Sequence, residues 1–171
     1  MLYRTMGTTG ETLSILGFGC MRLPQTTDCH IDEKKATEMV RYAISKGVNY
    51  FDTAYVYHNG ESEPFLGNAL SGGLRDKVNI ATKMPVWDVQ RREDMDRFLD
   101  EQLARLRTDH IDYYLLHGLM KKTWHQVEDL DVGGFLDQAI SDGRIRHAGF
   151  SFHDCYPLFE EIVRAYPWTF C

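Results

Sequence analysis

Long apolar runs, closely spaced cysteines and clustered basic residues are all scarce in this sequence of 171 residues. No apolar run approaches the roughly 20 residues that a membrane helix needs, so we expect no membrane segment. The 19 basic residues are outnumbered by 25 acidic ones and form no stripe, which argues against a nucleic-acid partner. The first residues contain no apolar core of a secretory signal, so we expect a cytoplasmic protein.

Cysteine spacing excludes several kinds of site. The four cysteines are Cys20, Cys29, Cys155 and Cys171, and no two of them form a CxxC pair. We therefore expect reduced thiols and no metal site. The glycines of GFGCMR are not followed by the GxGxxG loop that binds dinucleotides in a doubly wound sheet.

Short apolar runs alternate with amphipathic stretches along the whole chain. The runs, which predict buried strands, are 14–19, 48–53, 78–83, 111–117 and 147–152. The amphipathic stretches, which predict helices, are 32–46, 62–70, 93–106, 132–141 and 156–165. This alternation predicts βαβ units with a parallel sheet, in one α/β domain that spans 1–171. The segment LYRTMGTTGETLSILG predicts a small β-hairpin with a glycine turn before the first of these strands.

Two α/β folds fit this pattern. The chain holds five strand–helix units, and its last residues, PWTFC, have the composition of a sixth strand. A (β/α)8 barrel usually needs about 250 residues. A flavodoxin-like sheet of five strands fits the length better, so the decision between the two rests on motifs.

Polar side chains stand at the carboxyl ends of four successive runs: Asp52, Lys83, His117 and Ser151. In a parallel barrel these ends share one face, and that face carries the active site. Tyr57 lies five residues beyond Asp52, in the loop over the same face. Each residue alone has an ordinary explanation, such as a helix-capping aspartate, a solvated lysine or a hydrogen-bonded core histidine. Their coincidence at one face favours a catalytic group.

The segment DTAYVYHNGESE, with the residues after it, resembles the aldo/keto reductase signature that follows the second barrel strand. The matching residues are Asp52, Tyr57, either Glu61 or Glu63, and Leu66-Gly67. The segments YRTMGTTGETLSILGFGCMRLP, DHIDYYLLH and DGRIRHAGFS are similar to that family's hairpin with its first strand, its fourth strand and the approach to its fifth. The resemblance implies a TIM-type (β/α)8 barrel with an N-terminal β-hairpin, truncated after about five βα units.

The resemblance also implies an activity. Members reduce an aldehyde or ketone to an alcohol with hydride from NADPH, and NADH is the alternative donor. Tyr57 would be the general acid. Lys83 would favour loss of its proton, because a neighbouring ammonium stabilises a phenolate. Asp52 would hold Lys83 charged and oriented, and His117 would donate a hydrogen bond to the carbonyl oxygen of a small carbonyl substrate.

By the same resemblance, the cofactor-binding residues are Gly19, Cys20, Met21, Asp52, Ser151 and Phe152. The first four would border the nicotinamide ribose, and Ser151 would contact the carboxamide. Many members have an asparagine where this chain has Phe152, whose side chain offers no hydrogen bond to the carboxamide.

The segments FSFHD and YPWTFC look most like a bacterial branch of the family. Longer members of that branch carry a ferredoxin-like iron–sulfur segment, which these 171 residues do not include. The alternative to an active reductase is a truncated, inactive fragment. Open barrel edges would then favour self-association, because unpaired strand edges pair with other chains.

Overall fold

A two-stranded hairpin precedes the sheet, as the sequence predicts. The computed structural model describes residues 1–7 and 9–171. Strands β1 (Tyr3–Thr5) and β2 (Thr12–Ser14) pair antiparallel. Thr8, which belongs to the predicted turn, lies outside the described residues.

The main sheet has five parallel strands in chain order. They are β3 (Phe18–Gly19), β4 (Tyr50–Asp52), β5 (Asn79–Met84), β6 (Ile111–Leu119) and β7 (Ile145–Phe152). Each strand pairs with the next along the chain, which is the order of a barrel and not of a flavodoxin-like sheet. Phe170 forms a single parallel bridge with Gly149, where the sequence predicts a sixth strand.

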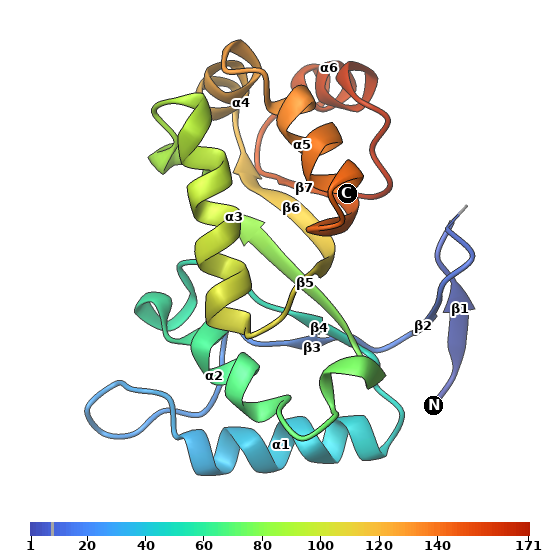
Figure 1. The fold of residues 1–171 in the computed structure, drawn as a ribbon, viewed down its shortest axis with the longest axis vertical. Helices are drawn as coiled ribbons and strands as arrows, with labels where there is room; N and C mark the ends of the chain where they lie inside the picture. The colour runs from blue at the N-terminus through green and yellow to red at the C-terminus, as the bar shows by residue number, and fades with distance from the viewer. Residues whose placement is uncertain (8) are drawn as a thin grey trace.

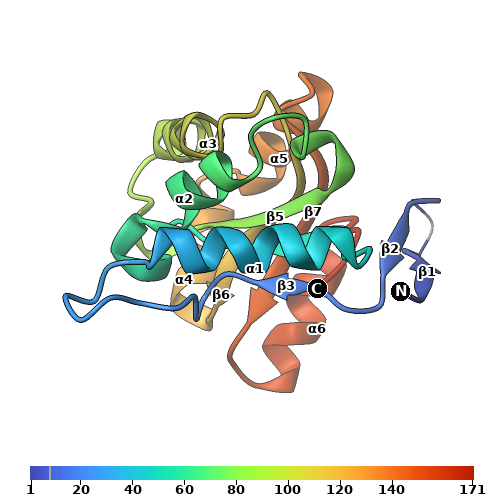
Figure 2. The same cartoon turned by 90° about the horizontal axis from the view of Figure 1, so that it is seen from below.

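The helices lie in an arc outside the sheet, and the hairpin stands on the opposite side (Figure 1). They are α1 (Glu33–Ser45), α2 (Ser62–Ala69), α3 (Arg92–Leu106), α4 (Lys121–Asp129), α5 (Val132–Ser141) and α6 (Tyr156–Ala165). The described residues also form three 3₁₀ turns between strands and helices, η1 (Tyr57–Gly60), η2 (Arg75–Lys77) and η3 (Val86–Asp88). Seen from below, α1 crosses in front of the sheet and the hairpin lies beyond the far end of that helix (Figure 2).

Helix α1 shows how the local sequence sets these boundaries. The carboxylate of Asp32 accepts a hydrogen bond from the Lys35 N–H and caps the first turn. Ala36 and Val40 are buried one turn apart on its inner face. Gly47, directly after the helix, has a φ of 87°. Glycine adopts this left-handed conformation more easily than other residues because it has no side chain, and it commonly ends a helix.

Both faces of the sheet are buried, and strand β6 shows the alternation. Tyr114 and Leu116 point outward into the large core between sheet and helices. Tyr113 and Leu115 point inward, where they pack with Leu13 of the hairpin. Near-continuous apolar runs are typical of parallel strands covered on both faces, which is why the sequence identified these strands well.

The largest differences from the sequence prediction are a shortened first strand and an additional helix. The first predicted strand, 14–19, is only Phe18–Gly19 in the sheet, and Ser14 belongs to β2. Ser14 is held there because its N–H donates to Asn49 Oδ1 at 2.7 Å and its Oγ accepts from the Asn49 N–H at 3.1 Å. Helix α4 was not predicted. Only Thr123, Trp124 and Val127 are buried in it, so its apolar stripe is too narrow to stand out.

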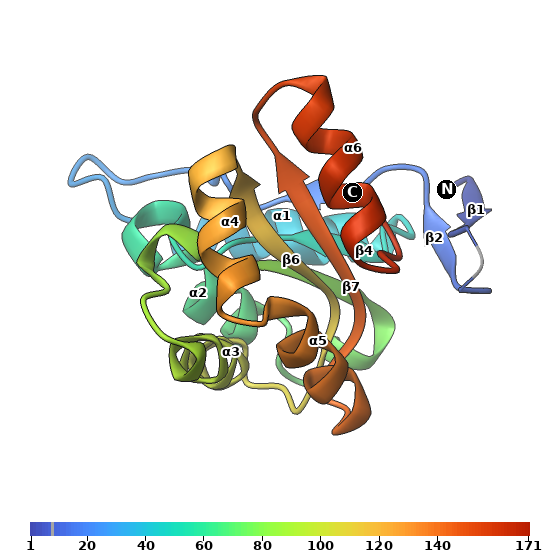
Figure 3. The ribbon, with the colours of Figure 1, turned by 90° about the horizontal axis from the view of Figure 1, so that it is seen from above.

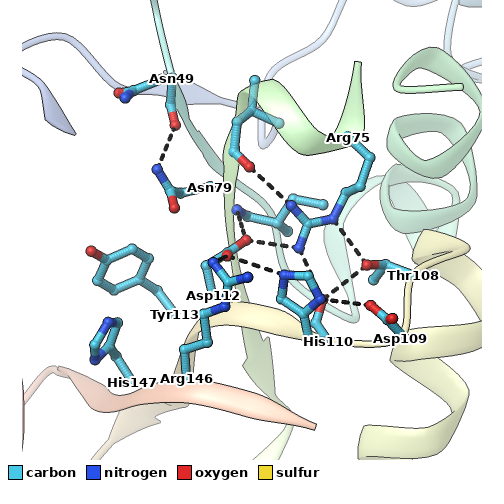
Figure 4. Close-up of polar contacts among 12 residues, drawn as sticks. Asn49, Arg75, Asn79, Thr108, Asp109, His110, Asp112, Tyr113, Arg146 and His147 are labelled. Carbon is cyan, nitrogen blue, oxygen red and sulfur yellow. Dashed lines mark hydrogen bonds and ion pairs between the residues drawn. The ribbon is translucent and has the colours of Figure 1, made fainter. Parts of the chain in front are cut away.

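A charged network joins the amino-terminal ends of three strands (Figure 4). The buried carboxylate of Asp112 accepts hydrogen bonds from Arg75, from Arg146 and from the Ile80 N–H, each at 2.8 Å. The two arginines come from η2 and β7, so one carboxylate ties η2, β5, β6 and β7 together. In a barrel this end serves stability and not catalysis. Within the described residues, no helix is both long and apolar enough to cross a bilayer.

Candidate active site

The four strand-end residues lie at the carboxyl-terminal ends of four neighbouring parallel strands. Asp52 ends β4, Lys83 lies one residue before the end of β5, and His117 and Ser151 lie near the ends of β6 and β7. Figure 3 shows β6 and β7 running side by side in the same direction. Tyr57 begins η1, directly beyond this edge.

Lys83 is the centre of the polar group. Its Nζ donates to Asp52 Oδ1 at 2.7 Å, to the Thr53 carbonyl at 2.7 Å and to the Tyr57 hydroxyl at 3.1 Å. An ammonium group has three protons, so each of them has an acceptor. The Lys83 side chain is only 7% exposed, whereas that of Asp52 is 33% exposed. Asp52 and the Thr53 carbonyl therefore hold the ammonium in place, and its third N–H donates to the Tyr57 hydroxyl.

The loop that carries Tyr57 has an unusual backbone. His58 and Asn59 both have left-handed conformations, with φ of 52° and 54°, which are uncommon for residues other than glycine. The His58 ring holds the neighbouring loop, because its Nε2 accepts a hydrogen bond from the Leu23 N–H at 3.1 Å. This pairing fixes the Tyr57 loop against the segment that follows β3.

His117, on β6, faces Tyr57. The two ring centroids are 5.8 Å apart in an edge-to-face arrangement, and Trp87 lies 5.1 Å from His117 on the other side. Burial lowers the pKa of His117 to about 4, and the nearby ammonium of Lys83 acts in the same direction. His117 is therefore neutral at pH 7. Its Nδ1 is buried and has no hydrogen-bond partner among the described residues.

A cavity of about 610 Å³ opens above these side chains. Tyr57 and His117 form part of its floor, and Met21, Val56 and Trp87 form apolar walls. Its size falls within the range of small-molecule pockets. Tyr57 and His117 therefore border the same space, and proton donation to a small ligand requires a donor placed beside it.

The predicted cofactor residues occupy different environments. At Gly19 an added Cβ would meet no atom within 4 Å, and Met21 is 57% exposed. Cys20 is fully buried, and its N–H donates to the Asp52 carbonyl at 2.8 Å. Burial, followed by the charge of Asp52, raises the pKa of the Cys20 thiol to about 12, so the thiol remains protonated.

On the far side of the site, Ser151 and Phe152 lie at the end of β7. The hydroxyl oxygen of Ser151 accepts a hydrogen bond from the Gly118 N–H at 2.7 Å, directly beside His117. The ring of Phe152 packs against Phe159 of α6, with centroids 5.4 Å apart. The contacts of Ser151 and Phe152 with a cofactor stay predictions.

The two glutamates that fit the family signature differ in their surroundings. Glu63 is fully buried, whereas Glu61 pairs with His30 at the surface. The Glu63 carboxylate accepts from Thr82 Oγ1 at 2.6 Å and from Gln102 Nε2 at 2.7 Å. Burial raises the pKa of Glu63, although these hydrogen bonds oppose the shift.

The same network reaches the site from behind. Gln102 Nε2 also donates to the Lys83 carbonyl at 3.1 Å, and its Oε1 accepts from the Tyr114 hydroxyl at 2.8 Å. Gln102 was not singled out from the sequence. Its position in the helix could have indicated a buried polar role. Gln102 lies between Leu99 and Leu106 on the buried face of α3, where an amphipathic helix normally has apolar residues.

Comparisons with known proteins agree with this geometry. The sequence profile of the Aldo/keto reductase family matches residues 15–166. The chain belongs to the aldo/keto reductase family. A probable aldo-keto reductase 1 of Glycine max is 32% identical over 154 residues, which are 85% of this chain and 43% of that protein. The uncharacterized oxidoreductase YqkF of Bacillus subtilis is 31% identical over 161 residues, 88% of this chain and 49% of that protein.

Solved aldo/keto reductase structures share the fold. The holo form of aldo-keto reductase AKR11C1 from Bacillus halodurans superposes with a TM-score of 0.81 at 30% identity, over 98% of this chain and 55% of that one. An aldo/keto reductase from Klebsiella pneumoniae in complex with NADP and acetate has a TM-score of 0.69 at 26% identity, over 82% of this chain and 46% of that one. The predicted TIM-type α/β fold is confirmed, and the chain spans about half the length of the curated relatives it matches.

Proposed function

We propose that this aldo/keto reductase chain reduces an aldehyde or ketone to an alcohol with NADPH, and that Tyr57 is the general acid. The observation that carries the proposal is the Lys83 ammonium, which reaches both the Tyr57 hydroxyl and the Asp52 carboxylate. The buried ammonium thus donates to a phenol that lines a cavity. That arrangement suits a proton donor.

The residues at the strand edge fit a nicotinamide cofactor. Gly19 leaves open space beside the chain, and Asp52 is one-third exposed with Oδ1 engaged by Lys83. We propose that Asp52 accepts a ribose hydroxyl, that the backbone of Gly19, Cys20 and Met21 borders it, and that Ser151 contacts the carboxamide, with Phe152 beside it. When bound, NADPH supplies the hydride that adds to the carbonyl carbon.

The protein's own groups would deliver the proton. Tyr57 Oη donates it to the carbonyl oxygen as negative charge develops there, and the O–H bond of the phenol breaks. The Lys83 ammonium stabilises the resulting phenolate, while Asp52 keeps Lys83 charged. Neutral His117 donates a second hydrogen bond to the same oxygen and orients the substrate, since its low pKa keeps it uncharged at pH 7.

The test is transfer of label. The 171-residue chain is mixed with a panel of aldehydes and ketones and with NADPH or NADH deuterated at C4 of the nicotinamide. We expect carbonyl-dependent oxidation of NADPH and one deuterium on the carbinol carbon of the alcohol. Cofactor oxidation without label in the alcohol, or no cofactor oxidation with any carbonyl of the panel, would refute the proposal.

A further inference from the structure

A positively charged, solvent-exposed side chain lines the cavity above Tyr57. Arg22 lines it together with Tyr57 and His117. The Arg22 guanidinium forms no hydrogen bond or ion pair with any residue in the part of the chain that the structure describes. None of the described side chains that line the cavity is a carboxylate. The carboxylate of Asp52, close by, is already paired with Lys83.

The backbone around Arg22 is held on both sides. The Cys20 N–H donates to the Asp52 carbonyl, and the Cys20 carbonyl accepts from the buried hydroxyl of Ser62 at 3.3 Å. On the other side, the Leu23 N–H donates to the His58 ring. The segment is therefore fixed while the guanidinium is left without a partner. A preorganised backbone lowers the cost of placing the side chain on a ligand.

The remaining walls define the other half of a ligand. Met21, Val56 and Trp87 offer apolar surface next to the floor formed by Tyr57 and His117. A molecule that fills this space has a carbonyl at the floor, an apolar or aromatic body along the wall and a negative group at Arg22. The guanidinium fork matches a carboxylate with two parallel hydrogen bonds. The net charge of −6 repels anions from the protein as a whole, so a local cation is needed to recruit one.

We propose that Arg22 determines substrate specificity, and that the site selects aldehydes and ketones that carry a carboxylate. The inference rests on the proposed carbonyl reduction and names the class of carbonyl compound that the cavity accepts. Arg22 acts on binding and not on proton transfer. It holds the end of the substrate opposite the carbonyl.

The first test compares two substrates of matched shape. They are 4-carboxybenzaldehyde, which is an anion at pH 7, and 4-carbamoylbenzaldehyde, which is neutral. We expect a higher kcat/KM for the anion, and we expect Arg22→Gln to lower the ratio of the two values about tenfold or more, the size of one charge-assisted hydrogen bond. Arg22→Lys should keep part of the preference. Arg41→Gln, which removes an equal charge from the exposed face of α1, should leave the ratio unchanged.

An equal loss of preference in Arg41→Gln would overturn the inference, because long-range charge would then explain it. An unchanged ratio in Arg22→Gln would also overturn it. If Arg22→Gln weakens NADPH binding, measured by fluorescence titration, and leaves the substrate ratio unchanged, Arg22 binds a cofactor phosphate instead.

A second measurement does not depend on turnover. Binding of 4-carboxybenzyl alcohol and 4-carbamoylbenzyl alcohol is followed by NMR at the backbone amides of Leu23 and Tyr57. We expect the carboxylate compound to bind more tightly to the unmodified chain, and this preference to be lost in Arg22→Gln. If no carbonyl is reduced but the carboxylate still binds through Arg22, the proposed function fails and the anion site stands. If neutral carbonyls are reduced and neither compound distinguishes the two proteins, the anion site fails and the proposed function stands.

Discussion

At the scale of single residues, the account depends on how Lys83 uses its three protons. The sequence placed Lys83, Asp52 and Tyr57 near one another because the ends of parallel strands share an edge. It could not show that the Thr53 carbonyl takes the third proton, since that contact depends on the exact path of the chain after β4. Nor could it distinguish Glu61 from Glu63, because both fit the spacing and only burial separates them.

The low pKa of His117 has a consequence for stability. Its pKa is about 4 in the folded chain, against 6.5 for an ordinary histidine. Between these values the unfolded chain binds a proton at His117 and the folded chain does not, so stability falls as pH drops from about 6.5 towards 4. We expect His117→Asn to remove this contribution. Urea unfolding at pH 7.5 and pH 5 should show a smaller loss of stability on acidification in the variant than in the unmodified chain, and an equal or larger loss would contradict the assignment.

At the scale of elements, the positions of helices were predictable from the sequence, whereas contacts between distant segments were not. The predicted helices at 132–141 and 156–165 match α5 and α6, because apolar residues recur there at helical spacing. The link between the hairpin and the sheet through Ser14 and Asn49 was not predictable, since it joins residues 35 positions apart in the chain. The network behind Lys83 joins α2, β5, α3 and β6 and was hidden for the same reason.

Helices α2 and α3 meet closely at Gly67. A Cβ added to Gly67 would lie 2.6 Å from the Arg105 carbonyl oxygen and 2.8 Å from the Leu106 carbonyl carbon, both of them backbone atoms. We expect Gly67→Ala to destabilise the chain by about 1–3 kcal/mol, because the helices must separate. Gly133→Ala in α5 is the control. Its Cβ would lie 3.6 Å from the Tyr166 ring, an ordinary contact, so we expect no loss in urea unfolding. Equal effects of the two substitutions would contradict this packing.

The Asp112 network predicts a large effect far from the active site. Asp112→Asn removes the charge that two arginines share, and leaves the largely buried Arg75 without its carboxylate counter-charge. Breaking a buried pair on one side typically costs about 3–5 kcal/mol. Asp109→Asn is the matched control, because its side chain is 95% exposed. Urea unfolding should show a lower free energy of unfolding in Asp112→Asn only. A decrease below about 1 kcal/mol in that variant would contradict the role of the network.

At the scale of the whole molecule, the five-stranded sheet has β3 at one side and β7 at the other. The backbone groups of an edge strand can pair with another chain. We therefore predict that the 171-residue chain associates with itself, and that its mass by light scattering exceeds the 19.8 kDa of one chain and rises with concentration. A constant mass of one chain over the whole concentration range would contradict this prediction.

The central claim is that Tyr57 delivers the proton, and Tyr57→Phe tests it most directly. This substitution removes only the hydroxyl that Lys83 Nζ contacts at 3.1 Å. Tyr42→Phe, on the exposed face of α1, removes a hydroxyl away from the site and serves as control. The account predicts that kcat for carbonyl-dependent NADPH oxidation falls about 10²–10⁴-fold in Tyr57→Phe, and that it does not change in Tyr42→Phe. Undiminished kcat in Tyr57→Phe would contradict the account.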